Sequence, residues 1–292
     1  MKSFRQLTRW REHLPFTVPL TVLGAIIASA NGAVLDSKLI FVVLANMATV
    51  SYAFMVNDIE DAEDDAIDAK KAKRNPISAG RISRDQAYTV ARALALVALF
   101  LFALTNKITF GVGLTTLLLS HLYSWRKVRL KAYPVTDIVS HSLMLSGLLL
   151  VSGFTAFSYE VKEIWILTAG VILFSIYGQL YNQLRDYMAD AKAGLKNTTL
   201  LVGKKRAEWL KNISIVFGAV AFLTAIYYKT FPVWLIFPVL VAMPLVFSLK
   251  MKTDTSGIAA IDISGKIQLQ VHLIVNIVIL VWLAQVFISS LI

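Results

Sequence analysis

Long apolar segments recur along the whole sequence, and they limit the fold more than any other feature. Runs of roughly 18 or more residues, nearly free of charge, are separated by polar connections. As a helix, such a run crosses the ~30 Å hydrocarbon layer of a bilayer. Hydrophobic residues make up 57% of the 292 residues, more apolar surface than one soluble core can bury. A membrane strand would alternate apolar and polar residues, which these runs do not do, so we predict an all-α polytopic membrane protein.

The connections between these runs alternate in length. We predict nine transmembrane helices around a central apolar chamber, at 14–33, 38–57, 85–106, 108–123, 137–157, 164–185, 208–228, 231–249 and 270–292. Connections after odd-numbered spans are short, and those after even-numbered spans are long and polar. The short ones hold only Lys38, Lys107, Lys162 and Lys229, whereas the N-terminal segment and the long loops hold nearly all other basic residues.

The uneven distribution of basic residues predicts the topology. By the positive-inside rule, the N-terminus and the long loops face the cytoplasm, so the net charge of +11 is concentrated on that side. Attraction to anionic membrane lipids follows from the same excess. We exclude nucleic acid as a partner because the chain contains no soluble basic domain.

An acidic stretch follows the second span. Asp58, Asp61, Asp65 and Asp68 are three, four and three residues apart, an interval that places them on one face of a helix. Glu60, Glu63 and Asp64 fall off that face. Carboxylates at the end of a membrane helix are costly unless a cation binds there, although a solvated acidic loop would be the simpler interpretation of one such stretch.

A second acidic stretch makes the simpler interpretation much weaker. Asn182, Asp186 and Asp190 lie four residues apart at the end of the sixth span, on the same predicted side of the membrane. Like charges at this spacing repel one another on an isolated helix. Two facing carboxylate groups could share one or two Mg²⁺ ions, which typically take one or two carboxylates, waters and phosphate oxygens. We therefore predict a polar, metal-binding cap.

Basic residues accompany both acidic stretches. The first is followed by Arg74, the second by Lys192 and Lys196, and the loop after the fourth span contains Arg129 and Lys131. Topology alone explains any single one of them. Their placement beside both carboxylate groups favours a diphosphate, because Lys, Arg and metal ions stabilise the negative charge of a departing diphosphate.

Together these features resemble the UbiA superfamily of intramembrane prenyltransferases. The family motif Asn-Asp-x-x-Asp-x-x-x-Asp is matched by Asn57, Asp58, Asp61 and Asp65. The second motif, Asp-x-x-x-Asp followed by Lys-x-Gly-x-Lys-x-Thr, is matched by Asp186, Asp190, Lys192, Gly194, Lys196 and Thr198.

The basic loop and the segment after the first motif depart from the family pattern. The loop resembles Tyr-Ser-x-Pro-Pro-x-Arg-Leu-Lys and keeps Tyr123, Ser124, Arg129, Leu130 and Lys131. Arg126 and Lys127 stand in place of the two prolines. The family's Arg-Pro is present as Arg74-Asn75-Pro76, with one residue inserted.

The resemblance implies a function and a site. It implies one domain over 1–292, with cap loops at about 57–84 and 182–207, that transfers a prenyl group from a polyprenyl diphosphate to a lipophilic or aromatic acceptor in the membrane. The implied Mg²⁺ ligands are Asp58, Asp61, Asp65, Asp186 and Asp190, joined in catalysis by Asn57. The implied substrate-binding residues are Arg74, Tyr123, Arg129, Lys131, Asn182, Lys192 and Lys196.

Two other functions stay open. An intramembrane terpene cyclase of the same superfamily would release a cyclic hydrocarbon without an acceptor. A divalent-cation transporter would instead place carboxylates at mid-membrane in inverted repeats, and the sequence shows neither feature. The sequence leaves open the acceptor, the prenyl length and the oligomeric state, although the Tyr-Ser to Arg-Leu-Lys loop favours the branch with chlorophyll and ether-lipid synthases.

Overall fold

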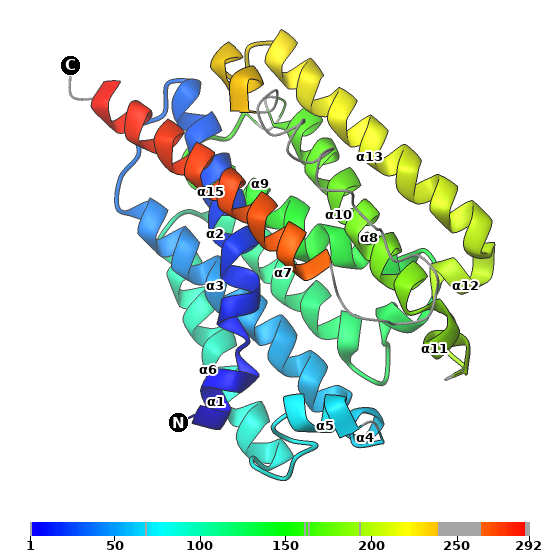
Figure 1. Ribbon diagram of the computed structural model, residues 1–292. Helices are drawn as coiled ribbons and strands as arrows, with labels where there is room; N and C mark the ends of the chain where they lie inside the picture. Colours follow the sequence, from blue (N-terminus) through cyan, green and yellow to red (C-terminus); the bar gives the residue numbers. More distant parts are fainter. Residues whose placement is uncertain are drawn as a thin grey trace.

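The described residues form a bundle of helices. The computed structural model describes residues 2–67, 69–160, 162, 164–192, 194–238 and 264–289, and these contain helices and no strand. The long helices run side by side in Figure 1. They are α2 (Trp10–Ala30), α3 (Lys38–Glu60), α6 (Arg84–Ala103), α7 (Lys107–Ser124), α10 (Trp165–Arg185), α13 (Lys204–Tyr227) and α15 (Ser264–Ser289).

Short helices connect or interrupt the long ones. The fifth predicted span consists of α8 (Thr136–Ser142), a π-helical turn η2 (Leu143–Gly147) and α9 (Leu148–Thr155). The remaining elements are α1 (Lys2–Leu7), α4 (Ala62–Asp65), α5 (Ala69–Arg74), η1 (Leu130–Ala132), α11 (Tyr187–Lys192), α12 (Thr198–Val202) and η4 (Val233–Leu235).

Eight of the nine predicted spans coincide with helices in the described part of the chain. The eighth span, 231–249, lies mostly outside the described residues. Five helical segments are long and apolar enough to cross a bilayer, namely α2, α3, α6, the combined segment Thr136–Thr155 and α13. The number nine and the central chamber therefore stay predictions, while the all-α class is confirmed.

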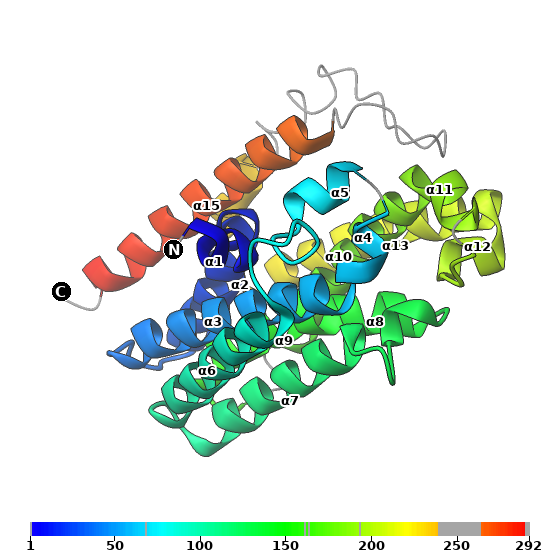
Figure 2. The same ribbon diagram turned by 90° about the horizontal axis from the view of Figure 1, so that it is seen from below.

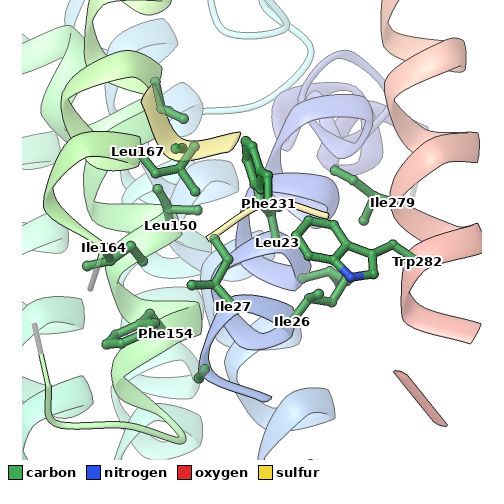
Figure 3. Packing of buried hydrophobic residues seen from close by; sticks show 14 residues of the cluster. Leu23, Ile26, Ile27, Leu150, Phe154, Ile164, Leu167, Phe231, Ile279 and Trp282 are labelled. Carbon is green, nitrogen blue, oxygen red and sulfur yellow. The ribbon is translucent and has the colours of Figure 1, made fainter. Parts of the chain in front are cut away.

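The largest apolar cluster joins helices that are far apart in the sequence. Figure 3 shows Ile26 of α2 beside Trp282 of α15, with Leu150 of α9 and Leu167 of α10 across the same interface. Each of these side chains is at most 5% exposed. The cluster packs the ends of α2, α10 and α15 that lie away from the acidic motifs (Figure 1).

Two glycines allow α2 and α9 to come close. A Cβ atom on Gly24 would lie 2.1 Å from the carbonyl oxygen of Leu150, and one on Gly153 would lie 2.0 Å from that of Thr21. Neither backbone could keep its place beside a larger residue. Small residues at a helix crossing increase the van der Waals contact that holds membrane helices together.

Helix α15 is joined to α2 by a hydrogen bond at a proline. Pro19 has no N–H, so the carbonyl of Pro15, four residues earlier, loses its normal partner within α2. The side-chain amide of Asn276 donates to that carbonyl at 2.9 Å. A neighbouring helix thus satisfies the backbone group that the proline frees, as a bilayer requires.

The elements that carry the acidic motifs lie at one end of the bundle. Figure 1 shows α4 and α5 at the bottom of the view, and α11 and α12 at its lower right. Viewed from below in Figure 2, the ends of α3 and α10 lie between these short helices. Both predicted motifs therefore reach the same side of the bundle.

Candidate functional site

The two acidic motifs share one backbone geometry. Helix α3 ends at Glu60 and is followed by Asp61, with φ −90° and ψ 0°; α10 ends at Arg185 and is followed by Asp186, with φ −92° and ψ 5°. Each aspartate still donates its N–H to the carbonyl of an asparagine four residues earlier, Asn57 at 2.9 Å or Asn182 at 3.0 Å. The next turn continues to Asp65 or Asp190. Each motif is thus a helix with one bend, in the sparsely populated backbone region where active-site residues often lie.

The predicted continuous helix is wrong in this detail, because each motif bends at its middle aspartate. The bend is small enough that the i to i+4 hydrogen bonds persist: Asp65 N–H lies 2.8 Å from the carbonyl of Asp61, and Asp190 N–H lies 2.9 Å from that of Asp186. The carboxylates therefore stay on neighbouring turns. Asp68, the fourth residue of the predicted acidic face, lies outside the described residues.

Asp61 is the centre of the first motif. Its carboxylate accepts a hydrogen bond from Lys131 Nζ at 2.5 Å and another from Arg129 at 3.1 Å. Lys131 also donates to Asn57 Oδ1 at 2.8 Å, and Ser124 Oγ donates to the same oxygen at 3.1 Å. Burial lowers the pKa of the Lys131 ammonium, while the Asp61 carboxylate opposes that shift. The sequence predicted each of these residues except Ser124 as part of the site.

Asp58 and Asp65 are linked through an asparagine. The side-chain amide of Asn75 donates to the Asp58 carbonyl at 2.7 Å and to Asp65 Oδ2 at 3.0 Å. The Asp58 carboxylate itself is buried and lies 3.5 Å from the guanidinium of Arg9. Arg9 also lies over the ring of Phe54, 4.4 Å from its centroid.

The acidic residues off the predicted face anchor the basic loop. Glu60 is 2% exposed and accepts hydrogen bonds from the hydroxyl of Tyr88 and the backbone N–H of Arg126. The guanidinium of Arg126 pairs with Glu63 at 2.6 Å and donates to the carbonyl of Glu60 at 2.8 Å. These contacts fasten the loop after α7 to the end of α3, and so place Arg129 and Lys131 beside Asp61.

The second motif is held from two sides. The Asp186 carboxylate pairs with the neighbouring Arg185, with both oxygens accepting at 3.1 Å. Asp190 Oδ2 accepts from the side-chain amide of Asn197 at 2.8 Å. Burial raises the pKa of the Asp190 carboxyl to about 6; Asp186 adds to the rise, while the ammonium of Lys71 opposes it. Lys71 belongs to α5, the short helix after the first motif, so this helix lies near Asp190 of the second motif.

Other predicted residues are less directly placed. Arg74 pairs with Glu12 at 2.8 Å, and Glu12 in turn pairs with Arg9, so the Arg74 guanidinium is linked to Asp58 through these two residues. Tyr123 lies on α7, and the centre of its ring is 6.2 Å from that of His141 in α8. Asn182, Lys192 and Lys196 have exposed side chains at the second motif. Their roles stay predictions.

Sequence reasoning missed several residues of this end of the bundle. Asn75 was treated as an insertion between Arg74 and Pro76, yet it bridges Asp58 and Asp65. Asn197 was one of the unspecified positions of the second motif. The signal available in the sequence was the same for both residues: each is an asparagine next to a motif residue, and its side-chain amide can donate and accept hydrogen bonds at the same time.

The arrangement fits a hard divalent cation. Each motif offers carboxylate oxygens, the donors that Mg²⁺ prefers, and Asp61 and Asp186 remain partly accessible. Within the described residues, no three carboxylate or histidine side chains already converge on one point. One or two carboxylates from each motif would therefore bind an ion, and phosphate oxygens and water would complete its coordination, as is usual for Mg²⁺.

Comparisons with known proteins agree on a family. A 4-hydroxybenzoate octaprenyltransferase of Pseudomonas fluorescens is 28% identical over 206 residues, which cover 69% of this chain and 67% of that protein. A lycopene elongase/hydratase of Haloferax volcanii is 30% identical over 187 residues, covering 62% of this chain and 57% of that protein. The matches thus span between about half and two thirds of these relatives.

Solved structures share the fold over nearly the whole chain. A UbiA homologue from Archaeoglobus fulgidus bound to GPP and Mg²⁺ superposes with a TM-score of 0.76 at 22% identity, covering 97% of this chain and 99% of that one. A structure concerned with digeranylgeranylglyceryl phosphate synthase gives 0.68 at 20% identity, with 98% of both chains covered. The sequence profile of the UbiA prenyltransferase family matches residues 17–261. Several helices are also apolar enough to span a bilayer, so this integral membrane protein belongs to the UbiA prenyltransferase family.

Proposed function

We propose that the chain catalyses Mg²⁺-dependent transfer of a prenyl group from a polyprenyl diphosphate to a lipophilic or aromatic acceptor in the membrane. Family membership supports the reaction type. The Archaeoglobus fulgidus homologue that shares the fold is bound to GPP and Mg²⁺. The relatives named above differ in acceptor, so the proposal does not choose among acceptors.

One observation carries the proposal. Asp61, at the bend of the first motif, is paired with both Lys131 and Arg129, and the second motif lies at the same end of the bundle. A carboxylate that is paired with two basic side chains can release both of them when a metal cation binds to the carboxylate instead. The freed ammonium and guanidinium are then available to phosphate oxygens, which Arg binds particularly well. Mg²⁺ and the diphosphate can thus bind together, and the net charge of the site then changes little because their charges largely cancel.

Each of these groups would have a defined task. Bound Mg²⁺ would act as a Lewis acid on the leaving diphosphate. Lys131 and Arg129 would hold the diphosphate oxygens and stabilise the charge that develops as the allylic C–O bond breaks. Asn57, hydrogen-bonded to Lys131, would keep the ammonium oriented. The apolar helices below would hold the prenyl tail and keep water away from the cation formed at C1.

The cap is proposed to face the cytoplasm, together with the N-terminus. The basic residues of the long loops support this orientation. The chain contains no cysteine, so single cysteines can report it without background. Ile67→Cys at the cap should be protected from an impermeant maleimide in intact cells, whereas Val34→Cys at the opposite end should react; both side chains are more than 80% exposed. The reverse labelling pattern would refute the orientation.

Diphosphate release by the purified protein tests the reaction. Geranyl, farnesyl and geranylgeranyl diphosphate would be supplied with and without Mg²⁺, and with and without a membrane-lipid extract as acceptor source. Release that requires both Mg²⁺ and the extract would support a prenyltransferase, and mass spectrometry of the product would identify the acceptor. Release without the extract, with a cyclic hydrocarbon as product, would show a cyclase instead. Absence of release with every donor and extract would refute the proposal.

A further inference from the structure

A buried carboxylate, unrelated to either acidic motif in sequence, lies between the two halves of the site. Asp137, in the first turn of α8, is 1% exposed. It accepts four hydrogen bonds, all from uncharged groups: Ile138 N at 2.8 Å, Gln183 Nε2 at 2.7 Å, Thr198 N at 2.8 Å and Thr198 Oγ1 at 2.5 Å. A buried carboxylate without a cation is stable only when hydrogen bonds satisfy it this fully.

Thr198 connects Asp137 to a strained backbone. Its hydroxyl donates to Asp137 and accepts from the backbone N–H of Val135 at 2.7 Å. Val135 has φ 71° and ψ −51°, a conformation that a β-branched residue rarely adopts. Such a conformation persists only where surrounding contacts hold it. The Thr198 hydroxyl is one of those contacts.

This pair of residues reaches both halves of the candidate site. On one side, Asn197, directly before Thr198, caps α12 and donates to Asp190 of the second motif. Gln183 of α10, which donates to Asp137, also accepts from Thr199 N at 3.1 Å, so α12 is fixed against the end of α10.

On the other side lies the basic loop. The hydroxyl of Thr136 donates to the Leu130 carbonyl at 2.7 Å, which ties the start of α8 to the turn that contains Lys131. A shift of Asp137 would therefore move the second acidic motif relative to Lys131, and Lys131 is bound to Asp61 of the first motif.

We propose that Asp137 and Thr198 form a positioning joint that holds the second acidic motif in register with the loop carrying Arg129 and Lys131. The proposal rests on the proposed function, since the register matters only if both halves bind one metal–diphosphate substrate. Neither residue contacts substrate; both act through the residues that would. Residues hydrogen-bonded directly to a metal ligand, as Asn197 is to Asp190, typically change metal affinity 10- to 100-fold when they are removed.

The test compares four buried substitutions in the full-length protein in detergent, of which Thr198→Ser keeps the hydroxyl. Asp137→Asn keeps the size of the side chain but cannot accept all four donors, and Thr198→Val removes only the hydroxyl. Thr155→Val is the matched control: Thr155 is also 1% exposed, it accepts a hydrogen bond from Thr109 at 3.1 Å, and it lies in α9, away from both motifs. For each variant, the Mg²⁺ concentration at half-maximal turnover and kcat would be measured with geranylgeranyl diphosphate. The shift of the thermal midpoint caused by Mg²⁺ with inorganic diphosphate would be recorded as well.

We expect Asp137→Asn and Thr198→Val to raise the half-saturating Mg²⁺ concentration by about tenfold or more. Thr198→Ser, which keeps the hydroxyl, and Thr155→Val should leave it near the wild-type value. Folded Asp137→Asn and Thr198→Val with wild-type Mg²⁺ dependence would overturn the joint. An equal rise of the half-saturating Mg²⁺ concentration in Thr155→Val would also overturn it, because the effect would then reflect a general loss of stability. If Asp137→Asn does not fold, the comparison of Thr198→Ser with Thr198→Val decides.

The proposed function can fail separately. Wild-type protein without turnover of any donor would refute the function, and the thermal shift with Mg²⁺ and inorganic diphosphate would then test the joint on its own. A smaller shift in Asp137→Asn and Thr198→Val than in Thr155→Val would support it. Equal shifts in all three, or no shift in the wild type, would overturn it.

Discussion

Lys131 offers the sharpest test of the site, because its substitution should weaken substrate binding much more than it destabilises the fold. Its ammonium lies between Asn57 and Asp61, with 15% of the side chain exposed. Substitution Lys131→Met keeps much of the apolar stem and removes the charge. Asp61 is not left unpaired, since Arg129 remains at 3.1 Å. The fold should therefore tolerate the change better than the reaction does.

The expected magnitudes follow from these contacts. Loss of one hydrogen bond to a charged partner costs about 1.5–3 kcal/mol. If Lys131 contributes that much to holding the departing diphosphate, kcat/KM falls about 10- to 150-fold, since each ~1.4 kcal/mol is a factor of ten. The remaining Arg129 contact limits the loss of stability to about 1–2 kcal/mol, which lowers the thermal midpoint by a few degrees in a protein of this size.

Diphosphate release at saturating Mg²⁺ measures the first quantity and a thermal scan in detergent measures the second. Lys131→Arg is the matched control, because it keeps the charge but changes the geometry, and it should retain more activity than Lys131→Met. A Lys131→Met protein that folds and keeps kcat/KM within about twofold of the wild type would remove this residue from the site and refute the reasoning.

The remaining predictions concern the metal, a helix contact and the strained turn. Asp61→Ala and Asp190→Ala should each abolish Mg²⁺-dependent release while the protein still inserts; activity retained in either would contradict a shared metal site. Asn276→Leu removes the donor to the Pro15 carbonyl and should destabilise the protein by about 1–2 kcal/mol with KM unchanged, whereas an unaltered thermal midpoint would show that this bond is not needed. Val135→Gly should fold at least as stably as the wild type, because relief of about 1–3 kcal/mol of strain offsets the entropy cost of glycine at a side chain that is 59% exposed. A clear drop in its thermal midpoint would contradict that estimate.

The spans were predictable because each apolar segment carries its own signal. Each span and each acidic motif is formed by residues close together in the sequence, so the sequence contains its signal locally. The helical spacing and the family resemblance predict Asn57, Asp61 and Lys131 for one site, and the structure brings the three side chains into contact; their roles stay predictions.

Contacts between distant segments were not predictable in the same way. Glu60 and Asp61 are adjacent in sequence, yet one is fixed by Tyr88 and Arg126 and the other by Lys131 and Arg129. Asp137 gave no signal at all, because a lone aspartate at a span boundary resembles a topology or capping residue. Its four donors, two of them from a residue 61 positions away, appear only in three dimensions.

The bond between Pro15 and Asn276 has a consequence for the synthesis of the protein. The two residues are separated by 261 positions, so the carbonyl in α2 is made long before its donor. During translation, that first long helix would enter the bilayer with an unsatisfied group, which water or another helix must cover for the time being. Only the arrival of α15 supplies this donor, so a chain without residues 264–289 would keep the Pro15 carbonyl without its Asn276 partner even with both acidic motifs already made.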